Sequence, residues 1–314
     1  MKEILPLVSI MGPTGIGKTS LAFDLYDKLD AEIISVDSVQ IYKHLDIGSG
    51  KPSKDLLKKY PHKLINKINP CDSYSSALFR EEALQEICLA SENNKLPLLV
   101  GGTMLYFQSL FSGLSDMPET DPEVRQRIAQ QAELLGWEAM HKKLAEIDPT
   151  SAKRIHPNDT QRTQRALEVY ESSSKTLTDW HKENKKEMNP KLSNYTLFQF
   201  AIETENRESH RENVASRFQS MIDDGLVDEV ESILKMKGMN TDTSSMRSVG
   251  YRQVCEFLEG EISFDEMIFK GVTATRQLAK RQMTWLRSWK NLIWLNKSSQ
   301  DLCQQVQDKV FNEL

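Results

Sequence analysis

The sequence lacks the features that mark membrane, secreted and zinc-binding proteins. No apolar run approaches the roughly 20 residues that a membrane-spanning helix needs. The four cysteines lie far apart among the 314 residues and form no C-x-x-C pair. Neither a zinc site nor a disulfide framework is therefore indicated. We expect a soluble protein of the cytoplasm, where thiols stay reduced, with no membrane partner.

A secretion signal and internal repeats are also missing. The apolar stretch from Ile4 to Met11 is too short for a signal peptide, and it leads directly into a glycine-rich loop. We interpret this stretch as a first strand. The length suits one large domain or two ordinary ones. No additional oligomerisation module is evident, so we expect a monomer.

Net charge alone argues against a nucleic-acid partner. The chain has 40 Lys and Arg against 45 Asp and Glu, a formal charge of −5. Basic residues are nevertheless concentrated in residues 153–165 and 276–290, and the second segment holds no acidic residue. Arg276, Lys280 and Arg287 fall close to one face of a helix. Such segments are often solvated faces, so the charge pattern leaves an RNA partner open.

The most informative motif is a phosphate-binding loop near the N-terminus. Residues 12–19 fit the pattern G-x-x-x-x-G-K-[ST]. Its glycines let successive N–H groups point at one anion, and the following helix presents its positive end there. Lys18 adds a positive charge, and the Thr19 hydroxyl can hold Mg²⁺. The pattern predicts diphosphate or triphosphate binding by Gly12, Pro13, Thr14, Gly15, Ile16, Gly17, Lys18 and Thr19.

Short apolar runs separated by helical patterns predict the fold. We expect an α/β fold with a phosphate-loop NTPase-like parallel sheet, flanked by helices on both faces. The predicted strands are Leu7–Met11, Ile33–Val36, Leu98–Val100, Phe198–Ile202 and Leu292–Leu295. Thr14, Asp37 and the segment 101–103 each follow such a strand. Since ligands bind beyond the carboxyl ends of parallel strands, these positions are predicted to meet in one cleft.

The middle of the chain predicts an all-helical insertion. From Asp121 to Tyr170 the signals are helical, with Asp-Pro at 121–122 as a helix start and breaks at 148–149 and 156–157. Residues 172–194 are polar and lysine-rich, typical of a loop or a mobile helical tip. We assign residues 1–115 and 196–314 to the catalytic core and residues 116–195 to the insertion.

Two further residues are candidates for the chemistry of a phosphate-containing substrate, and the sequence leaves more than one role open for each. Asp37 ends an apolar strand and can serve as a helix N-cap, a magnesium ligand or a general base. Arg217 lies in the helical segment 212–222 and can clamp a departing pyrophosphate, or pair with a surface acid.

The combined motifs resemble one family, the bacterial tRNA isopentenyltransferases, also called tRNA dimethylallyltransferases. The resemblance runs from about Leu7 to Trp289. Beyond the phosphate loop it rests on segments 37–42, 46–48, 51–52, 61–62, 101–106, 154–168, 250–253 and 275–282. The phosphate loop alone is shared with many NTPases, whereas the ordered combination is specific.

The resemblance implies a reaction and an assignment of roles. A dimethylallyl group would move from dimethylallyl diphosphate to N6 of the adenosine 3′ of the tRNA anticodon, and pyrophosphate would leave. Asp37 matches the general base. Lys18, Thr19 and Arg217 would stabilise the diphosphate, with Thr19 holding Mg²⁺.

The resemblance also implies a tRNA-contacting set. The target base would leave its stack in the anticodon loop to reach the cleft. The insertion would contact the anticodon stem-loop. The implied tRNA contacts are Asp37, Ser38, Val39, Gln40, Thr103, Arg125, Gln161, Arg162, Thr163, Gln164, Arg165, Arg247, Gly250, Tyr251, Arg252, Lys280, Arg281, Gln282 and Arg287. Gln40, Gln161 and Gln253 are expected to read base edges.

The sequence departs from the family pattern at two positions, and two alternative functions remain open. Ile16 stands where the family often has serine, and Asn213 stands where it often has a second arginine. A phosphate-loop kinase would use ATP as donor and Asp37 to activate a hydroxyl. An RNA-binding ATPase would bind RNA according to its nucleotide state and leave the RNA unchanged.

Overall fold

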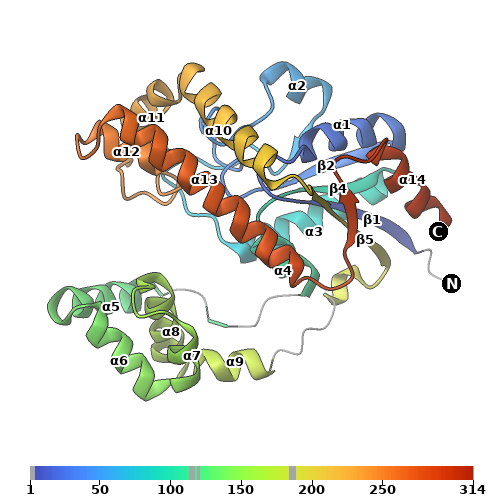
Figure 1. The fold of residues 1–314 in the computed structure, drawn as a ribbon. Coiled ribbons are helices and arrows are strands. Elements are labelled where there is room, and N and C mark those ends of the chain that lie inside the picture. Colours follow the sequence, from blue (N-terminus) through green and yellow to red (C-terminus); the bar gives the residue numbers. More distant parts are fainter. Residues whose placement is uncertain (1–3, 113–116, 119–120, 184–188, 314) are drawn as a thin grey trace. The chain divides into compact units, whose positions relative to one another are not determined.

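The chain divides into two compact units in the computed structural model, which describes residues 4–112, 117–118, 121–183 and 189–313 (Figure 1). One unit comprises Met1–Leu110 and Pro190–Leu314, and the other comprises Phe111–Asn189. Each has a hydrophobic core of its own. Within the described part of the chain, every helix is too short or too polar to cross a membrane.

A six-stranded parallel sheet organises the first unit. Its strands are β1 (Leu5–Met11), β2 (Ala31–Val36), β3 (His62–Lys63), β4 (Leu96–Gly101), β5 (Tyr195–Glu203) and β6 (Ile293–Asn296). Their order is β3-β2-β4-β1-β5-β6. The predicted α/β class and all five predicted strands are confirmed. Strand β3 was missed because two residues are too few to show a periodic pattern.

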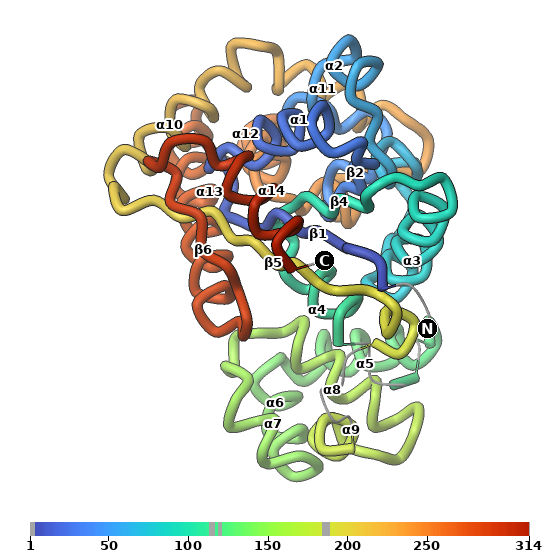
Figure 2. The backbone as a smooth tube through the Cα atoms, turned by 90° about the vertical axis from the view of Figure 1, so that its right-hand side faces the viewer, coloured from blue at the N-terminus to red at the C-terminus, as the bar shows by residue number. Residues whose placement is uncertain are grey.

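Helices cover both faces of this sheet, as Figure 2 shows. The helices α1 (Lys18–Leu29) and α14 (Leu302–Asn312) pack together on one face. The other face is covered by α3 (Ser76–Glu92) and α4 (Met104–Ser112). Val8 and Ile10 of the central strand β1 are fully buried. Burying such a side chain contributes about 1.5–3 kcal/mol, so the strands form as near-continuous apolar runs.

Five more helices belong to this unit: α2 (Lys54–Lys59), α10 (Arg207–Asp223), α11 (Leu226–Leu234), α12 (Tyr251–Leu258) and α13 (Phe264–Arg287). A reciprocal capping box starts α13, in which Ser263 Oγ accepts from Glu266 N and Glu266 Oε2 accepts from Ser263 N. Helix α13 packs against α10 at Gly271, where a Cβ atom would lie 2.1 Å from the Phe218 ring. Glycine therefore permits the close approach of these two helices.

The register of the strands decides where the functional loops begin. Met11 at the end of β1 pairs with Gly101 at the end of β4, and Gly101 pairs with Val36 at the end of β2. The three following loops therefore leave from one edge of the sheet. This is the edge at which parallel α/β sheets bind ligands.

The second unit is a helical bundle. Its helices are α5 (Pro122–Leu135), α6 (Trp137–Ile147), α7 (Pro149–Arg154), α8 (Thr160–Ser173) and α9 (Leu177–Glu183). Asp121, Asp148 and Asp159 cap α5, α7 and α8, as the breaks in the sequence suggest. Val124, Ile128 and Leu144 belong to its apolar core.

The polar stretch 172–194 is more ordered than its composition suggests. It contains α9 and, in the first unit, a 3₁₀ turn at Pro190–Leu192. Asp148 accepts hydrogen bonds from the amide and the hydroxyl of Thr178 at 3.0 and 2.6 Å. This contact holds the start of α9 against α7, which local composition does not reveal. Residues 184–188 lie outside the described part.

Candidate active site

The phosphate-binding loop joins β1 to α1. Gly17 precedes α1 with φ 111°, a left-handed conformation that disfavours residues with a Cβ atom. Ile16, one of the two departures from the family pattern, is 1% exposed and belongs to the core beneath the loop. Its side chain therefore anchors the loop and takes no polar role.

Lys18 points back into the loop. Its Nζ donates to the carbonyl oxygens of Gly12 and Pro13 at 2.9 and 2.8 Å. Part of its side chain reaches the surface, but protein surrounds the ammonium group. This burial lowers the pKa of Lys18 to about 8, against the opposing effect of the Asp37 charge. The group therefore changes charge near physiological pH.

This pKa predicts a pH-dependent affinity for diphosphates. The ammonium form binds the anion, and in the free protein it is the major form only below about pH 8. Above that pH, affinity is expected to fall by up to about tenfold per pH unit, until the pH reaches the higher pKa of the complex. Calorimetric titration with inorganic pyrophosphate from about pH 7 to about pH 9.5 measures the effect.

Lys18→Arg is the matched control for this titration, because a guanidinium stays charged throughout that range. Its affinity is expected to stay level where the wild-type affinity falls. A wild-type curve as flat as that of the arginine variant would contradict the lowered pKa.

Asp37 is held by its own turn after β2. Its Oδ1 accepts hydrogen bonds from Val39 N and Gln40 N at 2.8 and 3.2 Å. Among the described residues, no hydrogen bond reaches Oδ2. One oxygen therefore shapes the turn, as a cap does, and the other remains for chemistry. The charge of Asp37 also acts on Lys18 and Arg217, which places the three groups within electrostatic reach.

A cavity of about 530 Å³ brings most of the predicted catalytic residues together. We call it the transfer cavity. Thr14–Thr19, Asp37–Gln40 and Arg217 all line it, and so do Arg247, Gly250 and Gln282. Gly12 and Pro13 of the same loop are not among the described residues that line it. The cavity thus joins an anion-binding loop to an oriented carboxylate.

The arginine side of the cavity is less charged than the family pattern implies. Arg217 of α10 approaches the carbonyl oxygen of Gly50 at 3.5 Å, and more than a third of its surface stays accessible. Desolvation of the guanidinium lowers the pKa of Arg217, and Asp37 partly offsets this. An arginine remains charged regardless. Asn213, one turn earlier, also lines the cavity and adds no charge.

Sequence reasoning missed the residue that shapes the wall formed by residues 46–50. Glu229 of α11 accepts three consecutive backbone N–H groups, those of residues 46, 47 and 48, at 3.0, 2.7 and 3.2 Å. The Tyr251 hydroxyl donates to the same carboxylate at 2.7 Å. Gly48 and Gly50 of this loop line the cavity. No local pattern marks Glu229, because the loop amides that it accepts from lie about 180 residues away in the sequence.

Gln282 and Thr103 hold loops together. Gln282 Oε1 accepts from Thr14 N at 2.9 Å, and its Nε2 donates to Gly102 O at 2.8 Å. His210 Nε2 meets Thr14 O at 2.9 Å from the other side. Thr103 Oγ1 accepts from Ser38 N at 3.1 Å, and Thr103 is not among the described residues that line the cavity. Thr103 therefore supports the Asp37 turn, and its contact with tRNA stays a prediction.

Two residues expected at the RNA surface are buried instead. Tyr251 is 0% exposed, and burial together with Glu229 raises the pKa of its hydroxyl. Gln253 is 2% exposed, and its Oε1 accepts from Gly250 N at 2.9 Å. Neither side chain is exposed to a partner in this structure, so burial speaks against a direct tRNA contact by Tyr251 and against base reading by Gln253. Arg247 and Arg252 nearby are exposed, paired with Asp242 and Glu256 respectively.

The helical unit gathers the predicted residues of its own segment on α5 and α8. Arg125 and Arg165 approach the buried carboxylate of Glu168 at 3.8 and 3.7 Å. Gln164 Nε2 donates to Arg125 O at 3.3 Å. Arg162 pairs with Asp159, while Gln161 is exposed. These cations are thus oriented by acids of the same unit.

Thr163, which the resemblance implies as a tRNA contact, is buried in the helical unit. Its side chain is 0% exposed, and among the described residues no hydrogen-bond partner exists for its Oγ1. Thr163→Val is therefore expected to raise the free energy of unfolding by about 1 kcal/mol, because the unpaired hydroxyl is removed at constant shape. Urea denaturation measures this change, with Thr160→Val at the edge of the same helix for comparison. A loss of stability at 163 would reveal a partner for the hydroxyl.

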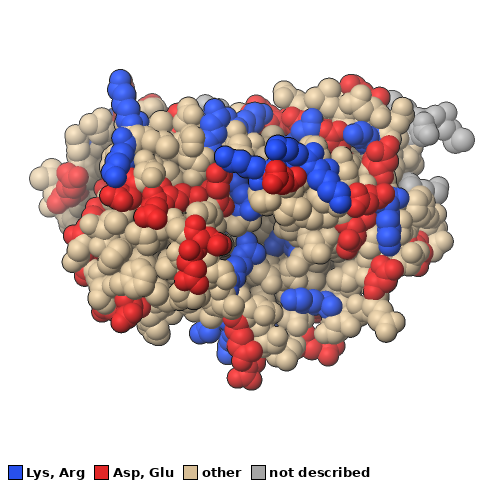
Figure 3. All heavy atoms as spheres, turned by 90° about the horizontal axis from the view of Figure 1, so that it is seen from above, with Lys and Arg blue, Asp and Glu red and all other residues tan. Residues whose placement is uncertain are grey.

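Helix α13 carries the remaining predicted cations, Lys280, Arg281 and Arg287, and all three are exposed. Basic and acidic side chains are interspersed on the face drawn in Figure 3, and basic ones border the hollow near its centre. The net negative charge of the chain therefore does not describe its local surfaces.

Comparison with known proteins identifies the family. A family model described as IPP transferase matches residues 40–289, which is most of the chain, and a second described as isopentenyl transferase matches residues 5–68. The chain belongs to the IPP transferase family. It is therefore a transferase, and the resemblance drawn from its motifs is confirmed.

Solved structures agree with this assignment. The tRNA δ(2)-isopentenylpyrophosphate transferase of Staphylococcus epidermidis is 32% identical, with 98% of both chains covered and a TM-score of 0.68. The full-length tRNA isopentenylpyrophosphate transferase of Bacillus halodurans is 30% identical, covering 98% of this chain and 95% of that one, with a TM-score of 0.69. A eukaryotic dimethylallyltransferase acting on tRNA is 23% identical over 98% of this chain and 79% of its own, and shares the fold at a TM-score of 0.78.

Proposed function

We propose that this protein transfers a dimethylallyl group from dimethylallyl diphosphate to N6 of the adenosine 3′ of the anticodon in tRNA, and releases pyrophosphate. One observation carries the proposal. In a chain of this family, an anion-binding loop and a carboxylate with one oxygen left for chemistry line the same cavity. The tRNA transferases of two bacteria at 30–32% identity support the choice of substrate.

Asp37 acts as the general base in this proposal. The N6 nitrogen forms a bond to C1 of the dimethylallyl group while the bond from C1 to the diphosphate oxygen breaks. The proton lost from N6 passes to Asp37 Oδ2. Because the amino lone pair is delocalised into the ring, orientation and proton removal supply much of the rate. The two backbone N–H groups on Oδ1 fix the carboxylate for this task.

Charge develops on the departing pyrophosphate at the other end of the cavity. The N–H groups of the loop and the ammonium of Lys18 stabilise that charge, and Arg217 contributes from α10. On binding the anion, Lys18 exchanges its two carbonyl partners for phosphate oxygens. The pKa of Lys18 then rises, which keeps the group charged during transfer.

The few protein oxygen atoms in the cavity that could bind Mg²⁺ fit an ion held mainly by the diphosphate of the substrate. Thr19 lines the cavity, and the described residues contain no cluster of three His, Cys, Asp or Glu side chains able to cage a metal. Mg²⁺ commonly binds through one or two protein oxygens, phosphates and water. The Thr19 hydroxyl would hold it in the proposal. When bound, the ion supplies positive charge that neutralises the pyrophosphate.

Exposed basic side chains of both units bind the tRNA in this proposal. Lys280, Arg281 and Arg287 on α13 contact backbone phosphates, as do Arg162 and Lys153 of the helical unit. Arg125 and Arg165 are held by Glu168, which limits their freedom before RNA arrives. Phosphate contacts of this kind position an RNA without reading its sequence.

The test is transfer of radiolabelled dimethylallyl diphosphate to unmodified tRNA with Mg²⁺ and without ATP. Label is expected in the tRNA, mapping to the adenosine beside the anticodon. The same tRNA with guanosine at that position is the matched control and should stay unlabelled. Absence of label, together with phosphate release from added ATP, would favour a kinase or an ATPase instead.

A further inference from the structure

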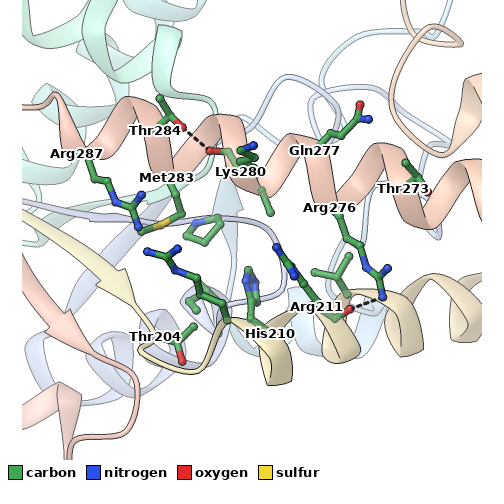
Figure 4. A pocket seen from close by; sticks show the side chains of 15 residues that line it. Thr204, His210, Arg211, Thr273, Arg276, Gln277, Lys280, Met283, Thr284 and Arg287 are labelled. Atoms are coloured by element: carbon green, nitrogen blue, oxygen red, sulfur yellow. Dashed lines mark hydrogen bonds between the residues drawn. The ribbon is translucent and has the colours of Figure 1, made fainter.

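A second cavity lies between α10 and α13, on the outer side of the phosphate-binding loop. Its volume is about 440 Å³, within the usual range for small-molecule sites. Figure 4 shows Arg276, Met283 and Arg287 extending from α13 toward α10, and His210 and Arg211 extending from α10 toward α13. The cationic side chains that line this α10–α13 cavity are Arg207, Arg211, Arg276, Lys280 and Arg287.

The charge of this cavity has one sign. No Asp or Glu occurs among the described residues that line it. In the part of the chain that the structure describes, none of its five cations takes part in an ion pair, whereas Lys51, Arg125 and Arg247 elsewhere are paired. The Arg276 guanidinium is directed only by a 3.4 Å contact with the Arg211 carbonyl oxygen. Five like charges facing one volume repel one another, and a bound anion relieves that repulsion.

The walls between the cations combine apolar side chains with uncharged polar ones, among them Gln277 and three threonines. Pro13, Ile16 and Val214 form one side, and Ala279 and Met283 form the other. A ligand that fits must therefore combine several negative charges with a flat or apolar part. A nucleoside diphosphate or triphosphate does so, since its phosphates concentrate about three or four charges beside a base that can lie on apolar side chains and arginine planes.

The α10–α13 cavity is separate from the transfer cavity. Their linings share only Ile16 and Val214 among the described residues, and the phosphate-binding loop forms the wall between them. Asp37, Lys18 and Thr19 all face the transfer cavity. A ligand in the α10–α13 cavity therefore meets none of the groups assigned to the chemistry of transfer, whereas Lys280 and Arg287 of its lining are also assigned to tRNA phosphates.

We propose that the α10–α13 cavity is a second anion-binding site that takes a free nucleoside diphosphate or triphosphate. A single RNA strand carries one charge per nucleotide, spread along its length, and matches five cations around 440 Å³ less well. The proposal does not use Asp37, Lys18 or Thr19, and it shares with the proposed tRNA contacts only Lys280 and Arg287.

ADP is the probe, and calorimetry measures its binding in a Lys18→Ala background that disables the phosphate-binding loop. ADP is expected to bind this protein. Adding Arg211→Gln and Arg287→Gln should weaken it by at least about tenfold, because two charged hydrogen-bond donors are lost. Both positions are exposed, so folding is expected to persist, and a thermal melt without ligand checks this.

Arg281→Gln in the same background is the matched control. Arg281 is exposed on the same helix and lines neither cavity, so ADP affinity should be unchanged. The proposal is overturned if Lys18→Ala alone abolishes ADP binding, or if the double substitution leaves ADP affinity intact. It is also overturned if the double substitution weakens only an RNA anticodon stem-loop, since the cavity would then hold an RNA phosphate.

Discussion

Asp37→Asn is expected to slow prenyl transfer by about 10²–10⁴-fold while leaving tRNA affinity nearly unchanged. Asparagine keeps an oxygen that can accept from Val39 N and Gln40 N, so the turn after β2 should persist. What it loses is the ability to take the proton from N6. Since that proton moves in the transition state, the loss should appear in kcat rather than in the binding of either substrate.

Single-turnover transfer with saturating tRNA measures this effect, and filter binding measures tRNA affinity. Asp37→Ala separates the two roles of the side chain, because it removes the turn contacts as well. We expect the alanine variant to lose stability that the asparagine variant retains. Near wild-type kcat in Asp37→Asn would remove Asp37 from the chemistry and leave it as a structural cap.

Lys18→Ala is expected to reduce transfer by about 10²–10³-fold and to weaken diphosphate binding, since it removes a fixed donor aimed at developing charge. The two carbonyl oxygens that Lys18 contacts, those of Gly12 and Pro13, would regain access to water. The loop itself should therefore keep its shape. Steady-state kinetics with varied dimethylallyl diphosphate separates the effect on KM from the effect on kcat.

Lys28→Ala provides the matched control for this substitution. Lys28 lies on the same helix, and its ion pair with Asp301 spans 3.9 Å at an exposed site. Such pairs contribute little, so kinetics and stability should both stay near wild type. Unchanged kinetics in Lys18→Ala would refute the role of the loop in binding the donor.

The structural features that could be predicted from the sequence are those encoded by residues adjacent in the chain. The phosphate-binding loop, the five longer strands and the starts of α5 and α7 at Asp-Pro pairs each follow from a local pattern. Asp37 followed from its place at the end of a strand. Parallel pairing then brings these loop starts together, because Met11 and Val36 both align with Gly101.

What the sequence did not reveal depends on contacts between distant segments. Glu229 shapes a loop 182 residues away, and Gln282 holds an amide 268 residues away. Tyr251 and Thr163 carry polar groups of the kind found at RNA surfaces, yet tertiary packing buries both. Burial of a single side chain in a helix face of mixed polarity leaves no trace in the sequence periodicity, so the sequence could not show that these two side chains are buried.

The order of the strands has a consequence for how the chain is made. β1 sits at the centre of the sheet between β4 and β5, but Tyr195 follows Gly101 by 94 residues. At ribosomal rates of about 5–20 residues per second, roughly 5–20 seconds pass between the synthesis of β4 and that of β5, and one edge of β1 stays unpaired during this time. The helical unit, with its own core, can fold in that interval. The nascent sheet meanwhile exposes the unpaired N–H and C=O groups along that edge of β1, which can pair with another chain.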